Sequence, residues 1–273
     1  MKKQLLHYNK FFTLLLLIAL IFCKCGGGEK EKRDEELQQF IKEFEAKFIP
    51  LDQQIRLAEF NAAVTGNDED YKKAAELNIQ LTKLFANKED FKTLKDIKEN
   101  GVIEDELLKR QFDILYGQYT FHQVDEKKME EMIRDAKNIQ QKFSIYRAEI
   151  DGKKYSDNQI DSILIHSRDH QELEKAWKAS KQVGEIVADE MIKLVKLRNE
   201  AAKSLGYDNY HAMRLSIDGQ DPEEITSLFE ELDILTKHEY SELKYRMDDT
   251  LASLYSISVE ELRPWHYQDR FVQ

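Results

Sequence analysis

The segment from Lys175 to Tyr210 decides the fold class, and its sequence is KAWKASKQVGEIVADEMIKLVKLRNEAAKSLGYDNY. Apolar residues recur in it every three or four positions, at Val187, Met191, Leu194, Leu197, Ala201 and Leu205. This spacing places them on one face of a helix. Gly206 comes directly after the last of them, where a helix that ends in the left-handed conformation favours glycine. The segment therefore predicts one long amphipathic helix that stops at Gly206. A second, aromatic-rich segment with Tyr207 and Tyr210 follows it.

The same periodicity extends through most of the chain. It predicts helices over residues 35–49, 51–64, 70–86, 91–97, 104–121 and 125–150, after Ser156-Asp157, and from Asp221-Pro222 onward. We expect Pro50 to break the first of these helices and Asp151-Gly152 to form a tight turn. The expected buried face of the last helix consists of Ile225, Leu228, Phe229, Leu232 and Leu235. Since no strand pattern of useful length is visible, the sequence predicts an all-α fold over residues 35–273, without a clear domain boundary.

Composition agrees with this fold class and excludes some partners. The 273 residues include only ten Gly and three Pro, and 34% are charged, which suits long helices. A net charge of −11 argues against nucleic acid as a partner, because there is no basic stripe to release counterions. Cys23 and Cys25 are the only cysteines, so the body can hold neither a disulfide framework nor a cysteine zinc site.

Residues 1–25 are typical of an export signal. Lysines precede an apolar run from Phe11 to Phe22, which is short for a membrane-spanning helix. Cys23 and Cys25 follow, and then a glycine-rich, charged segment over residues 26–34 that we interpret as a flexible tether. A cysteine here resembles the acceptor of a bacterial lipoprotein signal, so lipid on Cys23 or Cys25 would anchor the exported chain to the membrane. A cleaved secreted chain and an uncleaved anchor are the alternatives, and all three place the body outside the cytoplasmic membrane.

The histidines do not form a recognisable metal motif. His238-Glu239 begins like H-E-x-x-H, but Glu242 stands where that zinc motif needs its second histidine. His166 and His170 have the i, i+4 spacing, yet no third ligand is obvious, so we expect them on the solvent-exposed surface. The sequence also lacks a glycine-rich phosphate loop and a G-x-S-x-G motif. No catalytic residue and no metal ligand is assigned.

Several short motifs occur in a fixed order along the chain. They are Asp151-Gly152-Lys153, Ser167-Arg168, Ala176-Trp177, Gly184, Leu197 to Ala202, Gly206-Tyr207, Tyr210, Lys237 to Tyr240 and Pro264-Trp265-His266-Tyr267. In order and spacing, roughly from Glu35 to Gln273, the chain resembles a bacterial branch of the angiotensin-converting enzyme family. The resemblance implies an all-helical zinc dipeptidyl carboxypeptidase whose early helices form a lid and one wall of a cleft for the C-terminus of a peptide. The zinc ligands and the general-base glutamate come later in such chains and have no counterpart here.

The resemblance also implies a role for one residue, Arg214. It corresponds to an arginine that in animal members helps to hold a chloride ion, although Met213 replaces the aromatic residue that is usual before it. A core or surface arginine paired with a carboxylate is the alternative.

We therefore expect the N-terminal portion of an exported zinc peptidase that removes dipeptides from peptide C-termini. The chain ends at Gln273 inside a motif block, so we interpret it as truncated, inactive alone and without zinc of its own. The alternatives are a non-catalytic helical envelope lipoprotein that binds peptides or partner proteins, and a purely structural helical scaffold. In a truncated chain, the apolar face of the last helix and the Trp265-His266-Tyr267 group are expected to be exposed, and the body to be loosely packed.

Overall fold

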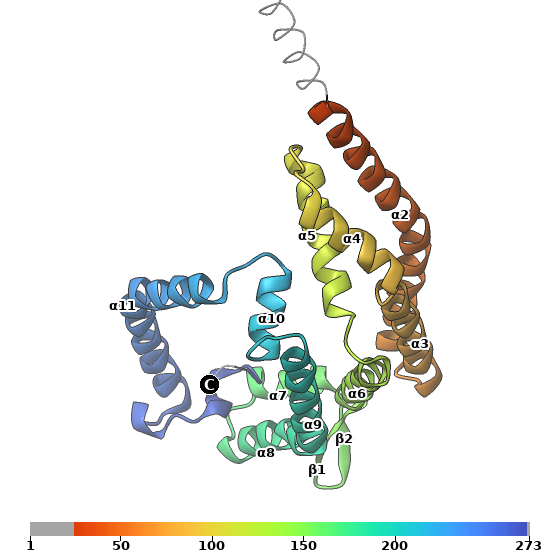
Figure 1. The fold of residues 1–273 in the computed structure, drawn as a ribbon. Coiled ribbons are helices and arrows are strands. Elements are labelled where there is room, and N and C mark those ends of the chain that lie inside the picture. The colour runs from red at the N-terminus through yellow and green to blue at the C-terminus, as the bar shows by residue number, and fades with distance from the viewer. Residues whose placement is uncertain (1–24, 272–273) are drawn as a thin grey trace, which may run out of the picture. The chain divides into compact units, whose positions relative to one another are not determined.

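The computed structural model describes residues 25–271, and nearly all regular structure in this range is helical (Figure 1). The elements are α2 (Cys25–Thr65), α3 (Asp68–Phe85), α4 (Lys88–Asn100), α5 (Glu106–Phe121), α6 (Glu126–Ile145), β1 (Ala148–Ile150), β2 (Lys153–Tyr155), α7 (Asp157–His166), α8 (His170–Lys181), α9 (Val183–Ser204), α10 (Tyr210–Ile217), α11 (Pro222–Tyr255), η1 (Val259–Glu261) and η2 (Pro264–Tyr267). The all-α prediction is confirmed. Within the described range, none of the helices has both the length and the hydropathy of a membrane span.

Polar side chains at the helix starts explain where most helices begin. The side chains that accept hydrogen bonds from first-turn backbone N–H groups are Asn87, Asp105, Asp125, Asp169, Asn209 and Asp221. Ser156 and Gln159 form a complete capping box at the start of α7. Gly206 has a positive φ of 87° directly after α9, which confirms the predicted left-handed stop. Local side-chain chemistry therefore determines these boundaries.

The first long helix differs from the prediction. α2 begins at Cys25 and so includes residues 26–34, in which the glutamates and lysines from Glu29 onward favour a helix. The interpretation of this segment as a tether stays a prediction. The predicted break at Pro50 was wrong, since α2 continues through it to Thr65. A proline inside a helix costs about 3 kcal/mol or more. Side chains buried on both sides of it, such as Phe44 and Ile55, supply packing that offsets this cost.

The predicted helix over residues 125–150 ends early. α6 stops at Ile145, and the chain then forms an antiparallel hairpin in which Ile150 pairs with Lys153. The turn residues Asp151 and Gly152 both have positive φ, as the tight two-residue turns of hairpins require. The turn was predicted correctly, but two strands of three residues are too short to produce a visible alternation in sequence.

The long helix predicted from Lys175 to Leu205 is divided in two. α8 ends at Lys181 and α9 begins at Val183, with Gln182 between them and no side chain capping the start of α9. Gly184 lies at this junction, and glycine is less favourable in a helix than alanine by about 1 kcal/mol. The apolar spacing continues across the junction, which is why the sequence pattern concealed it.

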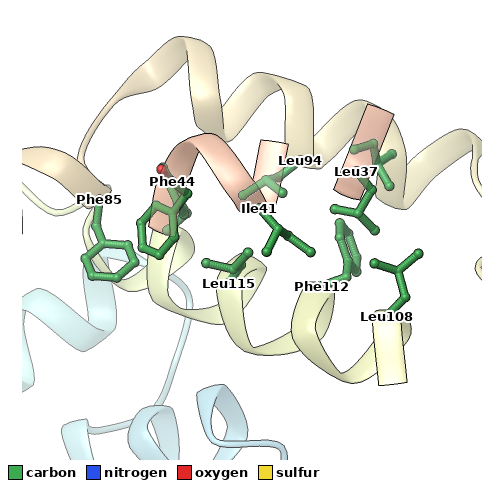
Figure 2. Close-up of a cluster of buried hydrophobic side chains, with 10 residues drawn as sticks. Leu37, Ile41, Phe44, Phe85, Leu94, Leu108, Phe112 and Leu115 are labelled. Carbon is green, nitrogen blue, oxygen red and sulfur yellow. The ribbon is translucent and has the colours of Figure 1, made fainter. Parts of the chain in front are cut away.

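The described chain divides into two compact units, although the sequence indicated no boundary. Unit 1 consists of residues 25–53 and 81–123 and is built from the first part of α2, the end of α3, α4 and α5. Figure 2 shows its apolar core, in which Leu37 and Leu94 are fully buried beside Phe112. Tyr119 is also fully buried, and its hydroxyl donates to Asp90 at 3.0 Å.

Unit 2 consists of residues 54–80 and 124–271. α6 and α9 lie along each other in it, joined by ion pairs from Lys142 to Glu190 and from Lys193 to Asp135. A second apolar core connects β1, α7, α8 and the end of α11. Its buried members are Ala148, Ile160, Leu164, Leu173, Ala176, Ala179, Leu251 and Tyr255.

Candidate functional site

The fold brings together motifs that are far apart in the sequence. Trp177 of α8 and Trp265 of η2 meet edge to face, with ring centroids 6.1 Å apart. His266 lies against Tyr255 at the end of α11, 4.9 Å between centroids. His170, at the start of α8, completes this motif cluster, which we define as His170, Trp177, Tyr255, Trp265 and His266.

A chain of hydrogen bonds runs through the two histidines of the motif cluster. The backbone N–H of Arg263 donates to Nδ1 of His266 at 2.9 Å, and Nε2 of His266 lies 3.0 Å from Nδ1 of His170. Because Nδ1 of His266 accepts, its proton is assigned to Nε2, which donates to His170. Burial, together with the neighbouring charges of His170 and Arg263, lowers the pKa of His266 below its ordinary value, which favours the neutral ring. His170 is thus half-buried and paired, which corrects its predicted place on the solvent-exposed surface, whereas His166 is exposed.

The segment after η1 is held firmly on unit 2. The guanidinium of Arg270 lies 2.7 Å from Asp161 and 3.1 Å from Asp157, both on α7. The hydroxyl of Tyr267 donates to Asp248 at 2.9 Å on α11. The Trp265-His266-Tyr267 group was predicted to be exposed, and this was wrong, because its rings pack against the second core and the side chains of His266 and Tyr267 have hydrogen-bond partners.

The first half of α11 is exposed, in contrast. Its apolar residues were expected to be covered in a complete fold and exposed in a truncated one. In the structure Leu228, Leu232 and Leu235 are exposed, Phe229 is 67% exposed, and Ile225 is half-buried. A pocket of about 720 Å³ lies between α10 and this half of α11, lined by His211, Ile225, Thr226, Phe229, Glu230, Asp233 and Ile234. Figure 1 shows α11 bending part way along, so that its second half returns to the motif cluster. We name Ile225, Leu228, Phe229, Leu232 and Leu235 the apolar face of α11.

Arg214 is positioned by α10, beside the fully buried Met213. Its guanidinium lies 3.5 Å from the carboxylate of Asp218, one helical turn further on. This contact is what we expect if Arg214 is a structural arginine paired with a carboxylate, which is the alternative to an anion-binding role. The role of Arg214 in holding an anion stays a prediction.

The two lipidation candidates lie at the edge of the described range. Cys23 falls outside it, and Cys25 is the first residue of α2. Lipid attachment at either cysteine therefore stays a prediction.

The described residues do not fit a zinc ion. Among residues 25–271, no three His, Cys, Asp or Glu side chains are grouped as metal ligands. His238 is exposed, and its Nε2 lies 3.6 Å from Glu242, the residue that replaces the second histidine of the motif. No chemical step on this chain is therefore assigned to a metal.

These features define an all-α protein with a packed motif cluster and an exposed apolar face on α11. A sequence model of the family described as angiotensin-converting enzyme matches residues 31–260. The chain belongs to the angiotensin-converting enzyme family, as the order of its motifs indicated, and is thus related to metallopeptidases. A search of curated proteins gave no significant match. The pairing of His170 with His266 was missed, because the two residues are 96 positions apart and nothing local in the sequence joins them.

Proposed function

We propose that this chain is the N-terminal portion of an exported zinc metallopeptidase of the peptidyl-dipeptidase type, which removes dipeptides from the C-termini of peptides. Membership of the family over residues 31–260 carries the proposal. The complete enzyme would bind zinc at an H-E-x-x-H motif, which the 273 residues lack. When bound, zinc makes a water molecule more acidic and polarises the scissile carbonyl.

In this proposal, the described residues form one wall of the peptide-binding cleft and take no part in the cleavage reaction. The motif cluster and the contacts of Leu251 and Tyr255 anchor the end of α11 on unit 2. The first half of the helix then presents its apolar face, with Phe229 67% exposed. Burying a large apolar side chain contributes about 1.5–3 kcal/mol, so several such residues favour a partner segment strongly. The occupant that we propose is the catalytic part of the peptidase, supplied by the same polypeptide or by a second one.

The pocket between α10 and α11 supports a second candidate, a non-catalytic peptide-binding lipoprotein. Its volume of about 720 Å³ lies within the range of about 300–1,000 Å³ that is typical of ligand sites. Apolar Ile225, Phe229 and Ile234 line it together with the carboxylates of Glu230 and Asp233. Both candidate functions require a partner to bind at the first half of α11. In the first the partner is the zinc-binding segment of the peptidase, and in the second it is a peptide.

Zinc content and peptide cleavage separate the two candidates. The purified 273-residue chain is expected to hold no stoichiometric zinc after dialysis and to release no dipeptide from peptide C-termini. Antibodies against this chain are expected to capture, from the source cells, material that includes an H-E-x-x-H segment and performs chelator-sensitive dipeptide release. Capture of the inactive 273-residue chain alone would support the peptide-binding lipoprotein. One tightly held zinc with cleavage by the purified chain would contradict its proposed inactivity.

Membrane attachment is expected to depend on Cys23 or Cys25. We expect the double variant Cys23→Ser, Cys25→Ser to leave the membrane fraction, because lipid anchoring rests on buried acyl chains that contribute about 0.8 kcal/mol for each CH₂ group. The single variants show which sulfur carries the lipid. Cell fractionation with immunoblotting is the measurement. A double variant that stays in the membrane fraction as fully as the parent would instead indicate an uncleaved N-terminal helix.

A further inference from the structure

The two histidines of the motif cluster belong to a hydrogen-bond chain in which each proton has a fixed place. A backbone N–H only donates, so Nδ1 of His266 must accept from the N–H of Arg263. The proton of a neutral His266 ring then lies on Nε2, which donates to Nδ1 of His170 at 3.0 Å. Nδ1 of His170 therefore accepts, and the chain is complete only while both rings are neutral.

One added proton breaks this chain on either ring. A protonated imidazole carries a proton on both nitrogens and accepts no hydrogen bond. A charged His170 would turn an N–H toward the N–H of His266, and a charged His266 would turn one toward the backbone N–H of Arg263. If His266 instead moved its proton to Nδ1, the bond from Arg263 would be lost. Acid therefore removes at least one of the two hydrogen bonds.

Water reaches the pair through His170. This ring is half-buried, whereas His266 is only 3% exposed. Burial, and then the neighbouring charges of His170 and Arg263, lower the pKa of His266, so the inner ring resists protonation. We therefore place the added proton on His170.

The charges around the pair partly favour and partly oppose this proton. Hydrogen bonds from Ser258, and then the charges of Arg263 and His170, lower the pKa of Glu261 in η1, so this carboxylate favours a charged His170. Arg263 and the positive end of the α8 dipole oppose it. The other charged groups on the adjoining elements are Arg168, Asp169 and Glu172 at the start of α8, Lys244 and Asp248 of α11, and Asp157 and Asp161 of α7, which pair with Arg270.

Two further polar groups destabilise the closed motif cluster. The indole N–H of Trp177 and the hydroxyl of Tyr255 are buried, and neither has a hydrogen-bond partner among the described residues. A buried polar group without a partner destabilises the state that buries it. Because opening of the cluster would give both groups water, the loss of one more hydrogen bond shifts the balance toward the open state.

We propose that the hydrogen-bonded pair of His170 and His266 is a pH-sensitive latch, which holds η2 on α8 at neutral pH and releases it in mild acid. The ion pairs of Arg270 with α7 contain no histidine and keep the following residues attached, so the opening is local and reversible.

The open state binds a proton that the closed state excludes. The closed state therefore loses stability as the pH falls below about 6.5, the ordinary pKa of histidine. This inference concerns the packing of η2 and is independent of the proposed peptidase function.

The two tryptophans of the chain report on the latch, because both belong to the motif cluster. Between about pH 7.5 and about pH 5.5, the range in which histidine titrates, we expect the emission of the purified full chain to move to longer wavelength and acrylamide to quench it more. For one proton, the ratio of open to closed chains rises at most about tenfold for each pH unit. Hydrogen exchange of the peptide that contains Arg263 should show the same loss of protection, whereas circular dichroism should show unchanged helix content.

Variants of the two neighbouring histidines test the assignment. His170→Asn removes the titrating ring, and its amide oxygen is still able to accept from His266. This variant should show no transition at the pH at which the parent opens, and His170→Gln carries the same test if the asparagine variant does not fold. His166→Asn is the matched control, because His166 is exposed on α7, and it should open like the parent.

The proposal is overturned if the tryptophan emission of the parent does not change over this pH range. It is equally overturned if the folded His170 variant keeps the transition of the parent, or if the His166→Asn control loses it. A simultaneous loss of helix content would show general acid unfolding and would also contradict a local latch. Zinc content and dipeptide release are not read in this experiment, so failure here leaves the proposed peptidase function unaffected.

Discussion

Replacing Leu94 by alanine is expected to destabilise unit 1 by about 2–5 kcal/mol. Leu94 of α4 is fully buried in the core that Figure 2 shows, between α2 and α5. Its loss leaves a cavity lined by apolar side chains, and the surrounding helices can collapse only in part. The net stability of a domain is about 5–15 kcal/mol, so the expected effect is a large fraction of it.

Hydrogen exchange measured by mass spectrometry can localise this loss of stability to the helices of unit 1. Both tryptophans, Trp177 and Trp265, belong to unit 2, so their fluorescence does not report on the core of unit 1. Amides of α4 and α5 should exchange faster in the Leu94→Ala variant. Leu107→Ala on α5 is the matched control, because Leu107 is 70% exposed and its truncation should change stability by no more than about 0.5 kcal/mol. Equal exchange in the two variants would contradict the assignment of Leu94 to the core.

Replacing Phe229 by glutamate is expected to weaken association through the apolar face of α11 tenfold or more. Burial of a phenylalanine contributes about 1.5–3 kcal/mol, and each 1.4 kcal/mol corresponds to about a factor of ten in affinity. In the purified chain, the variant should bind less hydrophobic dye and associate less with itself. In the complete peptidase that we propose, it should lower dipeptide release, because the catalytic segment would pack less firmly.

The variant should be folded as stably as the parent, because Phe229 is already 67% exposed. Ser227→Glu is the control, since it adds the same charge two positions away at an exposed polar residue. Dye fluorescence, sedimentation and far-UV circular dichroism are the measurements. A parent chain that is monomeric, melts sharply and binds no dye would show that the apolar face needs no partner, and would favour the stand-alone lipoprotein.

Local sequence predicted those parts of the fold that local chemistry determines. Asp221 followed by Pro222 begins α11, Ser156 begins α7, and Gly206 follows α9 in the left-handed conformation. In each case, the residue satisfies backbone groups that lie within a few positions of itself, or adopts a dihedral angle that others avoid. The prediction of such boundaries requires no knowledge of distant contacts.

Predictions failed where distant residues compete with local preference. Pro50 was expected to break a helix, but side chains on both sides of it are buried and α2 continues. The end of α6 was misplaced because Ala148 to Ile150 pair with a strand after the turn. Such outcomes depend on packing, which an apolar period in one segment cannot reveal.

The sequence by itself determined the all-helical class, the capped starts of helices such as α7 and α11, and the order of motifs that marks the family. Only the tertiary structure decided which apolar faces are covered. The amphipathic pattern of α11 is the same whether Phe229 meets a neighbour or solvent, and the structure leaves it exposed while it buries His266 in the motif cluster. The periodic spacing of apolar residues shows which face of a helix is hydrophobic. That face becomes buried only if another part of the protein, or a partner, packs against it.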